Sequence, residues 1–406
     1  MTLYIHSHCL LLFRSTIRED LLIDGGYSPM LTGTIEGQFS LIHIPLPLYA
    51  AVIQPILRVL LPHGGPAHTD EPEGLLSGLS TDNKHGFLNI SVTPLECSIV
   101  CHTTWAHSVF APTLSRLPKE DSNQCHISKD TYIIFSVNSA GMEAGQRVMD
   151  LTAPLAMAAI PIFFITTYYT DFILVPSKDR QTVCAALLDR GFEFSENDSA
   201  YVQAPPHPPH SRIPSSSSPP PTPPPSNVAE LQARTFSQLK KRNVVPFIEP
   251  DLHLVQCSGK EILGGHDPYR HGYSNGHHLP NSFLSSIDPK FYLGLVSALI
   301  TRPRFLSLTL ATDDAPSLLL DKSLLRLFGN SIVGDADGDL VPIFLDLETL
   351  PAESTGIVCG VAGRLCEVQG EGGELSYLST ARAGAVILTR EGSVRALDVL
   401  LPLLEK

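Results

Sequence analysis

The feature that most constrains this chain is an order of elements that it carries twice. Residues 131–191 contain a β-rich run, a helical segment, two β-rich runs joined by a three-residue turn, and a second helical segment that ends at Gly191. The expected strands are 132–137, 160–167 and 171–176, and the expected helices are 142–158 and 178–190. With one more strand, this order is a ferredoxin-like split βαβ unit.

The C-terminal residues 339–406 repeat that order. Strands are expected at 341–345, 374–379 and 385–389, and helices at 355–368 and 392–401. The two hairpins, FFITTYYTDFILV and LSYLSTARAGAVIL, both have an apolar strand, a polar end with threonine, a very short turn and a second apolar strand. Repetition at this scale predicts that one architecture is used more than once.

Shorter patterns of the same kind precede each copy. In the first half they are a weak strand at 3–13, a loop at 15–37, strands at 39–44, 87–92 and 96–101, and helices at 46–60 and 107–114. In the second half they are helices at 289–300 and 322–328 and strands at 304–309 and 317–320. We therefore expect an α+β protein of four tandem ferredoxin-like βαββαβ units in two repeated halves. Their expected bounds are 1–118, 128–202, 283–333 (a partial unit) and 339–406.

Residues 203–282 separate the halves and are expected to be a disordered linker. Their centre, SSSSPPPTPPPS, favours extended polyproline II and cannot bury a core. A ligand for an SH3 or WW domain is the alternative for this stretch. The polar part that follows carries several histidines, but no cysteine or carboxylate arrives at metal-ligand spacing, so a loop insert is preferred to a metal site.

Composition narrows the class of partner. The chain has 406 residues, 43% of them hydrophobic, and a formal net charge of −13. Nucleic acid and anionic membrane surfaces both require clustered Lys and Arg, so neither is expected as a partner. No apolar run reaches the roughly 18 residues that a membrane helix needs. The eight cysteines form no CxxC pair, and no secretory signal is recognised at the N-terminus. The chain is expected to be cytoplasmic with reduced thiols.

Catalytic and metal-binding motifs are not found. Asp335, Asp337 and Asp339 alternate as in a calcium loop, but Leu340 stands where glycine is needed and Asp346 where a bidentate Glu is needed. A surface turn is the preferred interpretation. No nucleophile elbow, zinc-protease, phosphate-loop or dinucleotide signature occurs. We therefore expect no enzyme activity, no cofactor and no metal.

Two short stretches remain as candidate sites. The cluster Tyr168–Asp171 is either a hairpin turn resting on the sheet or an exposed aromatic and acidic patch for a protein partner. The starts of the first helices of the two large units, at 138–141 and 350–356, expose free backbone N–H groups. Such a helix start holds a small anion or is simply capped, with Ser354 as a candidate N-cap, and both readings stay open.

The units resemble ACT domains, and their order together with the hairpin TTYYTDFILV resembles the CASTOR family of cytosolic arginine sensors and its fungal relatives. The resemblance covers nearly all of the chain except 203–280. It is strongest at 131–175 and at 354–365, which read STGIVCGVAGRL. It implies four ACT-like domains with an amino acid held between the second and the fourth.

The resemblance also implies which residues line that site. One wall is the strand after the first helix of the second unit, and the other is the loop, helix start and last hairpin of the fourth unit. The implied ligand-binding residues are Ile160, Pro161, Ile162, Pro351, Glu353, Ser354, Thr355, Gly356, Thr380, Ala381 and Gly384. The implied surface for a protein of a nutrient-signalling complex is Tyr168, Tyr169, Thr170 and Asp171.

This chain departs from the arginine sensors within the implied site. Pro161 stands where they place a serine, Ser354 where they place an acid, and Gly384 where they place an aspartate, while the cation Arg382 is added in the hairpin turn. A guanidinium needs acidic partners, so these changes disfavour arginine. We expect a neutral or acidic amino acid, or an unused pocket.

The sequence therefore predicts a non-catalytic amino-acid-binding regulator that passes its ligand state to a protein partner in TORC1-type nutrient signalling. The alternative is an ACT-type allosteric regulatory protein of amino-acid metabolism that binds an end product and an enzyme subunit. A homodimer is left open by the sequence.

Overall fold

The computed structural model describes residues 31–61, 86–138, 144–194, 225–260, 288–312, 314–351, 354–369 and 375–405. Within them, the order strand, helical segment, two strands, helical segment occurs four times. We call these stretches units 1 to 4. The predicted strand at 3–13, the helix start at 142–143 and most of the linker lie outside the described residues.

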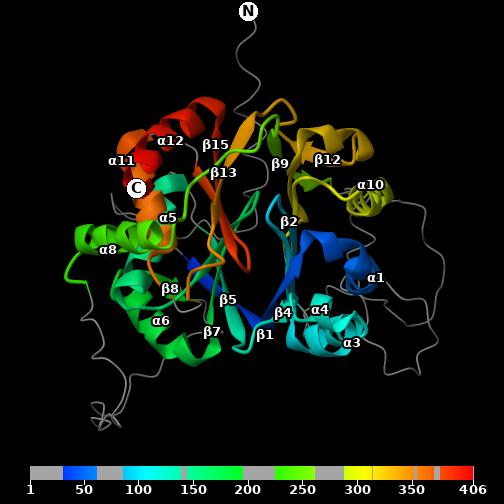
Figure 1. Cartoon of the computed structure of the whole chain (residues 1–406), viewed down its shortest axis with the longest axis horizontal. Helices are drawn as coiled ribbons and strands as arrows, with labels where there is room; N and C mark the ends of the chain where they lie inside the picture. The colour runs from blue at the N-terminus through cyan, green and yellow to red at the C-terminus, as the bar shows by residue number, and fades with distance from the viewer. Residues whose placement is uncertain are drawn as a thin grey trace, which may run out of the picture.

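Units 1 and 2 form the first half of the chain (Figure 1). Unit 1 consists of β1 (Leu31–Pro45), η1 (Leu46–Leu48), α1 (Tyr49–Leu60), β2 (Phe87–Val92), β3 (Glu96–His102), α2 (Thr103–Trp105), η3 (Ala106–Phe110), α3 (Ala111–Ser115), α4 (Lys119–Ser122) and β4 (His126–Ile127). Unit 2 consists of β5 (Tyr132–Asn138), α5 (Ala144–Met157), β6 (Phe163–Thr166), β7 (Asp171–Pro176), η4 (Ser177–Asp179), α6 (Arg180–Leu188) and β8 (Glu193–Phe194).

Helix α8 (Val228–Lys241) precedes the second half. Unit 3 consists of β9 (Leu254–Gly259), α10 (Pro289–Ile300), β10 (Leu306–Ala311), β11 (Ser317–Asp321), η5 (Lys322–Leu327) and β12 (Ile332–Gly334). Unit 4 consists of β13 (Leu340–Asp346), α11 (Ile357–Gln369), β14 (Leu375–Ser379), β15 (Ala383–Thr389) and α12 (Arg390–Leu404). The secondary structure predicted for both large units agrees with these elements to within a few residues at their ends.

The units do not form separate sheets. The described strands form one hydrogen-bonded sheet in the order β11-β10-β2-β3-β1-β5-β7-β6-β14-β15-β13-β9-β12, and a β11–β9 pairing closes this path on itself. Units 1 and 3 meet where β2 pairs with β10, and units 2 and 4 meet where β6 pairs with β14. The two pairs of units are joined where β1 pairs with β5 and β9 pairs with β13. Each unit therefore borders a unit of the other half along its outer strand.

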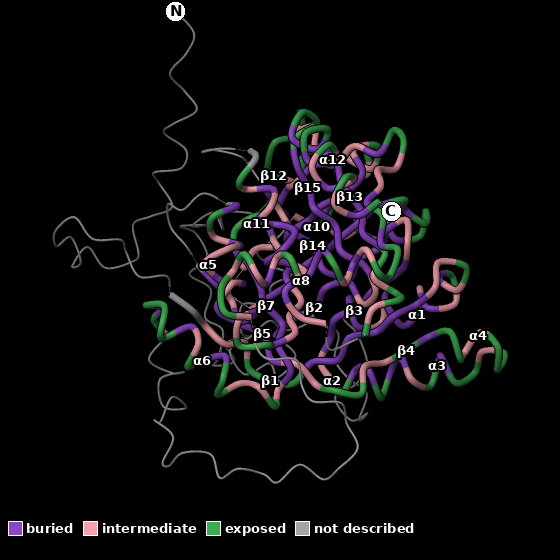
Figure 2. Tube along the Cα trace, turned by 60° about the vertical axis from the view of Figure 1, so that its left-hand side comes forward, coloured by how far each residue is buried: buried purple, intermediate pink, exposed green. Residues whose placement is uncertain are grey.

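The helices cover this sheet from outside. In Figure 1, α5, α6, α8, α11 and α12 lie on one side of the strands and α1, α3 and α10 on the other. Alternate residues of one strand enter different cores: Ile134 packs into the layer between the strands, whereas Ile133 and Phe135 pack beneath the helices. Every residue of FLNISV and DFILVP is buried, so these strands lack the alternation of apolar and polar residues that a half-exposed strand shows. Figure 2 shows the buried residues concentrated in the middle of the molecule.

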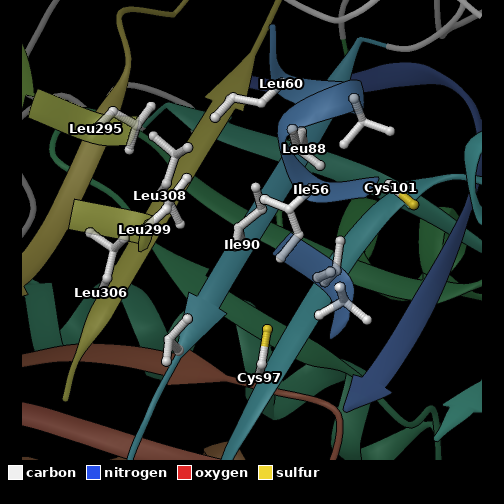
Figure 3. Packing of buried hydrophobic residues seen from close by; sticks show 14 of the residues in the cluster. Ile56, Leu60, Leu88, Ile90, Cys97, Cys101, Leu295, Leu299, Leu306 and Leu308 are labelled. Atoms are coloured by element: carbon white, nitrogen blue, oxygen red, sulfur yellow. The ribbon is translucent and has the colours of Figure 1, made fainter. Parts of the chain in front are cut away.

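The core of units 1 and 3 is shared between them. In Figure 3, Ile56 and Leu60 of α1 lie over Leu88 and Ile90 of β2, while Leu306 and Leu308 of β10, Leu295 and Leu299 of α10 continue the same cluster. All of these side chains are fully buried. Burial of a leucine or isoleucine contributes about 1.5–3 kcal/mol, so neither unit retains this core without the other.

Two expectations about non-regular segments are wrong. The segment 15–37 was expected to be a loop, but β1 begins at Leu31 and pairs with β5 through Ile35, where the register shifts before Phe39. Gly33 and Gly37 are untypical of a strand, so the sequence pattern did not indicate one here. Gly37 has a φ of 118°, which residues with side chains rarely adopt, at the irregularity between the two paired parts of β1.

The expectation of disorder for 203–282 is wrong for α8 and β9. Helix α8 is capped by Asn227, whose side chain accepts a hydrogen bond of 2.9 Å from the backbone N–H of Glu230. It buries Leu231, Phe236 and Leu239 against the helices of units 2 and 4. Strand β9 completes unit 3, which was expected to be partial and to begin at residue 283. The segment is polar on average, so its composition indicated neither the amphipathic face of α8 nor the short strand β9.

The junction of β2 and β10 contains a buried polar side chain. Asn89 donates to the hydroxyls of Ser307 (3.2 Å) and Thr309 (3.0 Å) and to the Leu308 carbonyl (3.2 Å). We expect Asn89→Ala to lower the free energy of unfolding by about 1–3 kcal/mol, because these buried groups lose their partner. Urea unfolding measures this change. The exposed Asn123→Ala is the matched control, with a change of about 0.5 kcal/mol or less, and equal effects of the two variants would contradict this role for Asn89.

Candidate functional site

A cavity of about 450 Å³ lies between units 1, 2 and 4. This volume is within the range of roughly 300–1,000 Å³ that is typical of small-molecule sites. The segment between α5 and β6 and the hairpin turn of unit 4 line it from opposite halves of the chain. Residues of the expected ligand site that line it are Pro161, Ile162, Pro351, Ser354, Gly356, Thr380 and Ala381. The structure thus brings together the two walls that the sequence comparison implied, and ligand binding by them stays a prediction.

Of the other expected residues, the three that the structure describes do not line the cavity. Ile160 is buried in the core under the helices of units 2 and 4. Thr355 is not part of the cavity wall, and Glu353 lies outside the described residues. Gly384 lies behind the wall, where a Cβ atom would come within 2.7 Å of the Tyr377 hydroxyl. Its role is therefore to make room for Tyr377.

Unit 1 contributes a wall that the sequence did not predict. Leu41 and His43 of β1, His126 of β4 and Ser128 all line the cavity. They reach it because β1 pairs with both β4 and β5, which places the start of unit 2 beside unit 1. The rings of His43 and His126 are stacked with their centroids 6.1 Å apart. No local pattern indicates these residues, because they meet the other walls only through the pairing of strands.

A buried carboxylate holds the unit 1 wall against unit 4. Glu96, 1% exposed, accepts hydrogen bonds from His43 Nδ1 (2.5 Å), the Thr380 hydroxyl (2.6 Å) and the backbone N–H of Arg382 (2.6 Å). The neighbouring Ser98 hydroxyl accepts from the backbone N–H of Ala381 at 3.1 Å. A buried carboxylate is costly unless it is hydrogen-bonded, and here three donors stabilise it. The hairpin turn of unit 4 is thereby fixed in position at the cavity.

Nearly half of the residues that line the cavity carry polar or charged side chains. Arg382 forms an ion pair with Glu348, and both side chains line the cavity. Tyr377 also lines it, is 1% exposed, and its hydroxyl has no hydrogen-bond partner among the described residues. Burial raises the pKa of the Tyr377 phenol, so the group stays protonated and is a donor. Buried polar groups are nearly always satisfied, so the unpaired hydroxyl of Tyr377, a residue that lines the cavity, is a candidate donor to a polar ligand atom.

Helix α8 covers the start of α11. Its Gln238 donates to the Ser354 hydroxyl at 3.0 Å, and its Thr235 hydroxyl lies 3.4 Å from the Gly356 carbonyl oxygen. Gly356 has a φ of 78°, and a Cβ atom there would lie 2.8 Å from Leu231. Helix α11 begins at Ile357, so the prediction of Ser354 as its N-cap is wrong. The segment taken for a linker thus supports one wall of the cavity.

The expected partner surface is only partly exposed. Tyr168 and Tyr169 are 37% and 55% exposed, and their rings pack edge to face with centroids 4.6 Å apart. Thr170 is buried and bonds to Thr167 across the turn. Asp171 is 2% exposed and forms an ion pair with Arg147; burial raises the pKa of Asp171 against the opposing effect of Arg147. The prediction of an exposed acid at this surface is wrong, and the two tyrosines alone are available.

The other motifs are accounted for within the described residues. The seven cysteines of the described part form no disulfide bond with one another, six of them are buried, and Cys9 lies outside that part. In the aspartate-rich turn, Gly338 bonds to the Asp335 carbonyl, while Asp339 binds His253 and Arg390. Among the residues described, no group of three His, Cys, Asp or Glu side chains is arranged to hold a metal. None of the described helices is long and apolar enough to cross a membrane.

Unit 2 matches the model of a known protein family. Residues 127–189 match the family model of the ACT domain. The match covers β5 to α6, and the remaining units have the same order of elements around it. ACT domains are typically regulatory domains that bind amino acids, so the match supports a regulatory role and an α+β, ACT-like fold.

Solved structures that resemble this chain are more distant. An aspartate kinase from Synechocystis matches at 10% identity and a TM-score of 0.31, covering 95% of this chain and 57% of that one. The regulatory subunit of the Thermus thermophilus aspartate kinase matches at 14% and 0.26, covering 42% and 100%. Protein Atu0741 from Agobacterium tumefaciens matches at 16% and 0.26, covering 41% and 93%. TM-scores this low carry no argument about the ACT-like arrangement. No curated protein sequence matches the chain.

The pKa of His126 is lowered from its ordinary value of 6.5, first by desolvation and then by Arg382 and His43, with Glu348 opposing. The unfolded chain therefore binds more protons than the ACT-like fold just below pH 6.5, and stability rises with pH through that window. We expect urea unfolding between pH 5 and 7.5 to show this slope, and His126→Gln to reduce it. His107→Gln, an exposed histidine outside the cavity, is the matched control. An unchanged slope in His126→Gln would contradict the assignment.

Proposed function

We propose that this protein is a non-catalytic regulator that binds an amino acid in the cavity between units 1, 2 and 4 and passes its ligand state to a protein partner. The observation that carries the proposal is the cavity itself, which combines apolar walls with one unpaired buried hydroxyl and one Arg–Glu pair. The ACT domain match at 127–189 supports an amino acid as the ligand.

The charges of the cavity favour a neutral or acidic amino acid. Glu348 is its one acid among the described lining residues, and Arg382 already neutralises it. A cationic side chain such as that of arginine would find no free carboxylate among the described lining residues, whereas an α-carboxylate finds the Arg382 guanidinium and the Tyr377 hydroxyl as donors. The apolar residues Pro161, Ile162 and Val358 leave space for an aliphatic or short polar side chain.

The proposed signal travels along β6. This strand begins beside the cavity at Phe163 and ends at the turn that carries Tyr168 and Tyr169. The turn is tied to unit 3, because the backbone N–H of Tyr168 donates to the Ser317 hydroxyl at 2.8 Å. A ligand that binds one arrangement of units 2 and 4 more tightly shifts the population toward it, and the tyrosine surface changes with it. We place this regulator in the cytoplasm, in TORC1-type nutrient signalling.

The ligand is tested by calorimetry of the full chain with the twenty L-amino acids. We expect a neutral or acidic amino acid to bind and Tyr377→Phe to weaken it about fivefold or more, since one hydrogen bond contributes about 1 kcal/mol. The stability of Tyr377→Phe should be unchanged or higher, because it removes an unpaired buried hydroxyl. Tyr292→Phe, whose hydroxyl is likewise unpaired but lies on α10 outside the cavity, is the matched control. Tight binding of arginine would refute the charge argument.

The partner surface is tested by affinity capture from a cell extract with and without the bound amino acid. We expect Tyr169→Ala to abolish recovery of the partner, because exposed aromatic residues are frequent anchors of interfaces. Leu293→Ala removes a comparably exposed apolar side chain elsewhere, on α10, and is the control. Recovery of components of a nutrient-signalling complex supports the proposal. Recovery of a biosynthetic enzyme would instead favour the alternative, an allosteric regulatory protein of amino-acid metabolism.

A further inference from the structure

A second cavity, of about 330 Å³, lies between units 1 and 3. It is separate from the first and shares none of its lining residues. Its walls are Leu46, the turn residues Thr93 and Pro94, Glu249 and Leu252, and the segment from Arg302 to Arg304. Neither the ACT domain match nor any motif of the sequence points to it.

The repeat makes this cavity the counterpart of the first. In the first cavity, a hairpin turn of unit 4 faces the segment between α5 and β6 of unit 2; in the second, a hairpin turn of unit 1 faces the segment between α10 and β10 of unit 3. The turns have the same backbone bond, from Thr380 N to the Ala383 carbonyl and from Thr93 N to the Glu96 carbonyl, both 2.9 Å. Each facing segment carries a residue with positive φ two positions after its helix, Ala159 at 56° and Arg302 at 55°.

The remaining walls correspond as well. Residues just before the first strand of unit 2, His126 and Ser128, line the first cavity, and residues just before the first strand of unit 3, Glu249 and Leu252, line the second. The segment after the first strand of unit 4 contributes Leu347 to one, and the segment after the first strand of unit 1 contributes Leu46 to the other. The two cavities are therefore lined by corresponding segments of the repeated units.

The first cavity contains the ion pair of Arg382 and Glu348, whereas two charged residues of the second cavity form no ion pair among the described residues. Arg304 is held by Asp321 and by the carbonyls of Pro250 and Asp251. Arg302 is exposed and donates one bond, of 3.2 Å, to the Leu46 carbonyl; among the described residues no other acceptor is found for it. Glu249 forms no ion pair within the described part of the chain. Arg302 and Glu249 thus line the same cavity, and no ion pair joins them.

We propose that this second cavity binds an amino acid as a zwitterion, with the α-carboxylate on Arg302 and the α-ammonium on Glu249. A guanidinium fork matches a carboxylate, and a carboxylate accepts from an ammonium, so the pair recognises both ends of the free backbone. The walls formed by Leu46, Pro94, Leu252 and Pro303 are apolar and select an aliphatic side chain. The proposal does not depend on occupancy of the first cavity.

The experiment is calorimetry of the full chain with L-leucine as the probe, and with inorganic phosphate as a second titrant. We expect L-leucine to bind, and Glu249→Gln and Arg302→Gln each to lower its association constant tenfold or more. Glu249→Gln is the sharper variant, since it breaks no ion pair among the described residues, whereas Arg302→Gln also removes the bond to Leu46. Glu405→Gln, an exposed acid near the end of α12, is the matched control.

The result separates this proposal from that for the first cavity. Loss of L-leucine binding in Glu249→Gln, with binding retained in Tyr377→Phe, supports the second site even if the first cavity binds nothing. An unchanged L-leucine association constant in Glu249→Gln overturns it. Binding of phosphate that strengthens in Glu249→Gln, with no binding of L-leucine, also overturns it, because the cavity would then be a simple anion site.

Discussion

The structure depends on hydrogen bonds between the edge strands of different units, whose backbone groups would otherwise be unpaired. A βαββαβ unit ends at an edge strand whose backbone groups need partners, and an exposed edge invites association. Here β2 pairs with β10 over six residues, and the short β6 pairs with β14. At the second junction side chains complete the contact: Ser379 accepts from the Phe164 N–H and Thr166 from the Tyr377 N–H, both at 3.0 Å. Because both junctions join different halves of the chain, neither half is complete alone.

That pairing also explains why the cavities lie where they do. The hairpin turn of unit 4 meets the segment that leads into β6, the edge strand of unit 2. The hairpin turn of unit 1 likewise meets the segment that leads into β10, the edge strand of unit 3. The turn Thr93–Glu96 takes part in both cavities: Thr93 lines the second, while Glu96 bonds to Thr380 and Arg382 at the first. The buried carboxylate of Glu96 thus fixes a wall of the first cavity, although the turn to which Glu96 belongs lines the second.

Much of this was accessible from the sequence, and the limits are physical. The elements of units 2 and 4 were predicted because apolar periodicity and glycine breaks are local signals, and seven of the residues expected for the first site do surround one cavity. Helix α8 was missed although Asn227 and Glu230 have the spacing of a helix cap. The burial of Asp171 beside Arg147 was missed because the adjacent tyrosines suggested an exposed turn.

The sequence by itself determined the repeated order of elements and the hairpins, because these follow from the spacing and type of neighbouring residues. Only the tertiary structure decided that units of different halves are paired, that His43 and His126 line the first cavity while Glu96 fixes its wall, and that a second cavity exists. These features arise from hydrogen bonds between strands that are far apart in the sequence, such as Ile42 with Ile127 and Leu88 with Leu310. No local pattern encodes which edge strand becomes the partner of another.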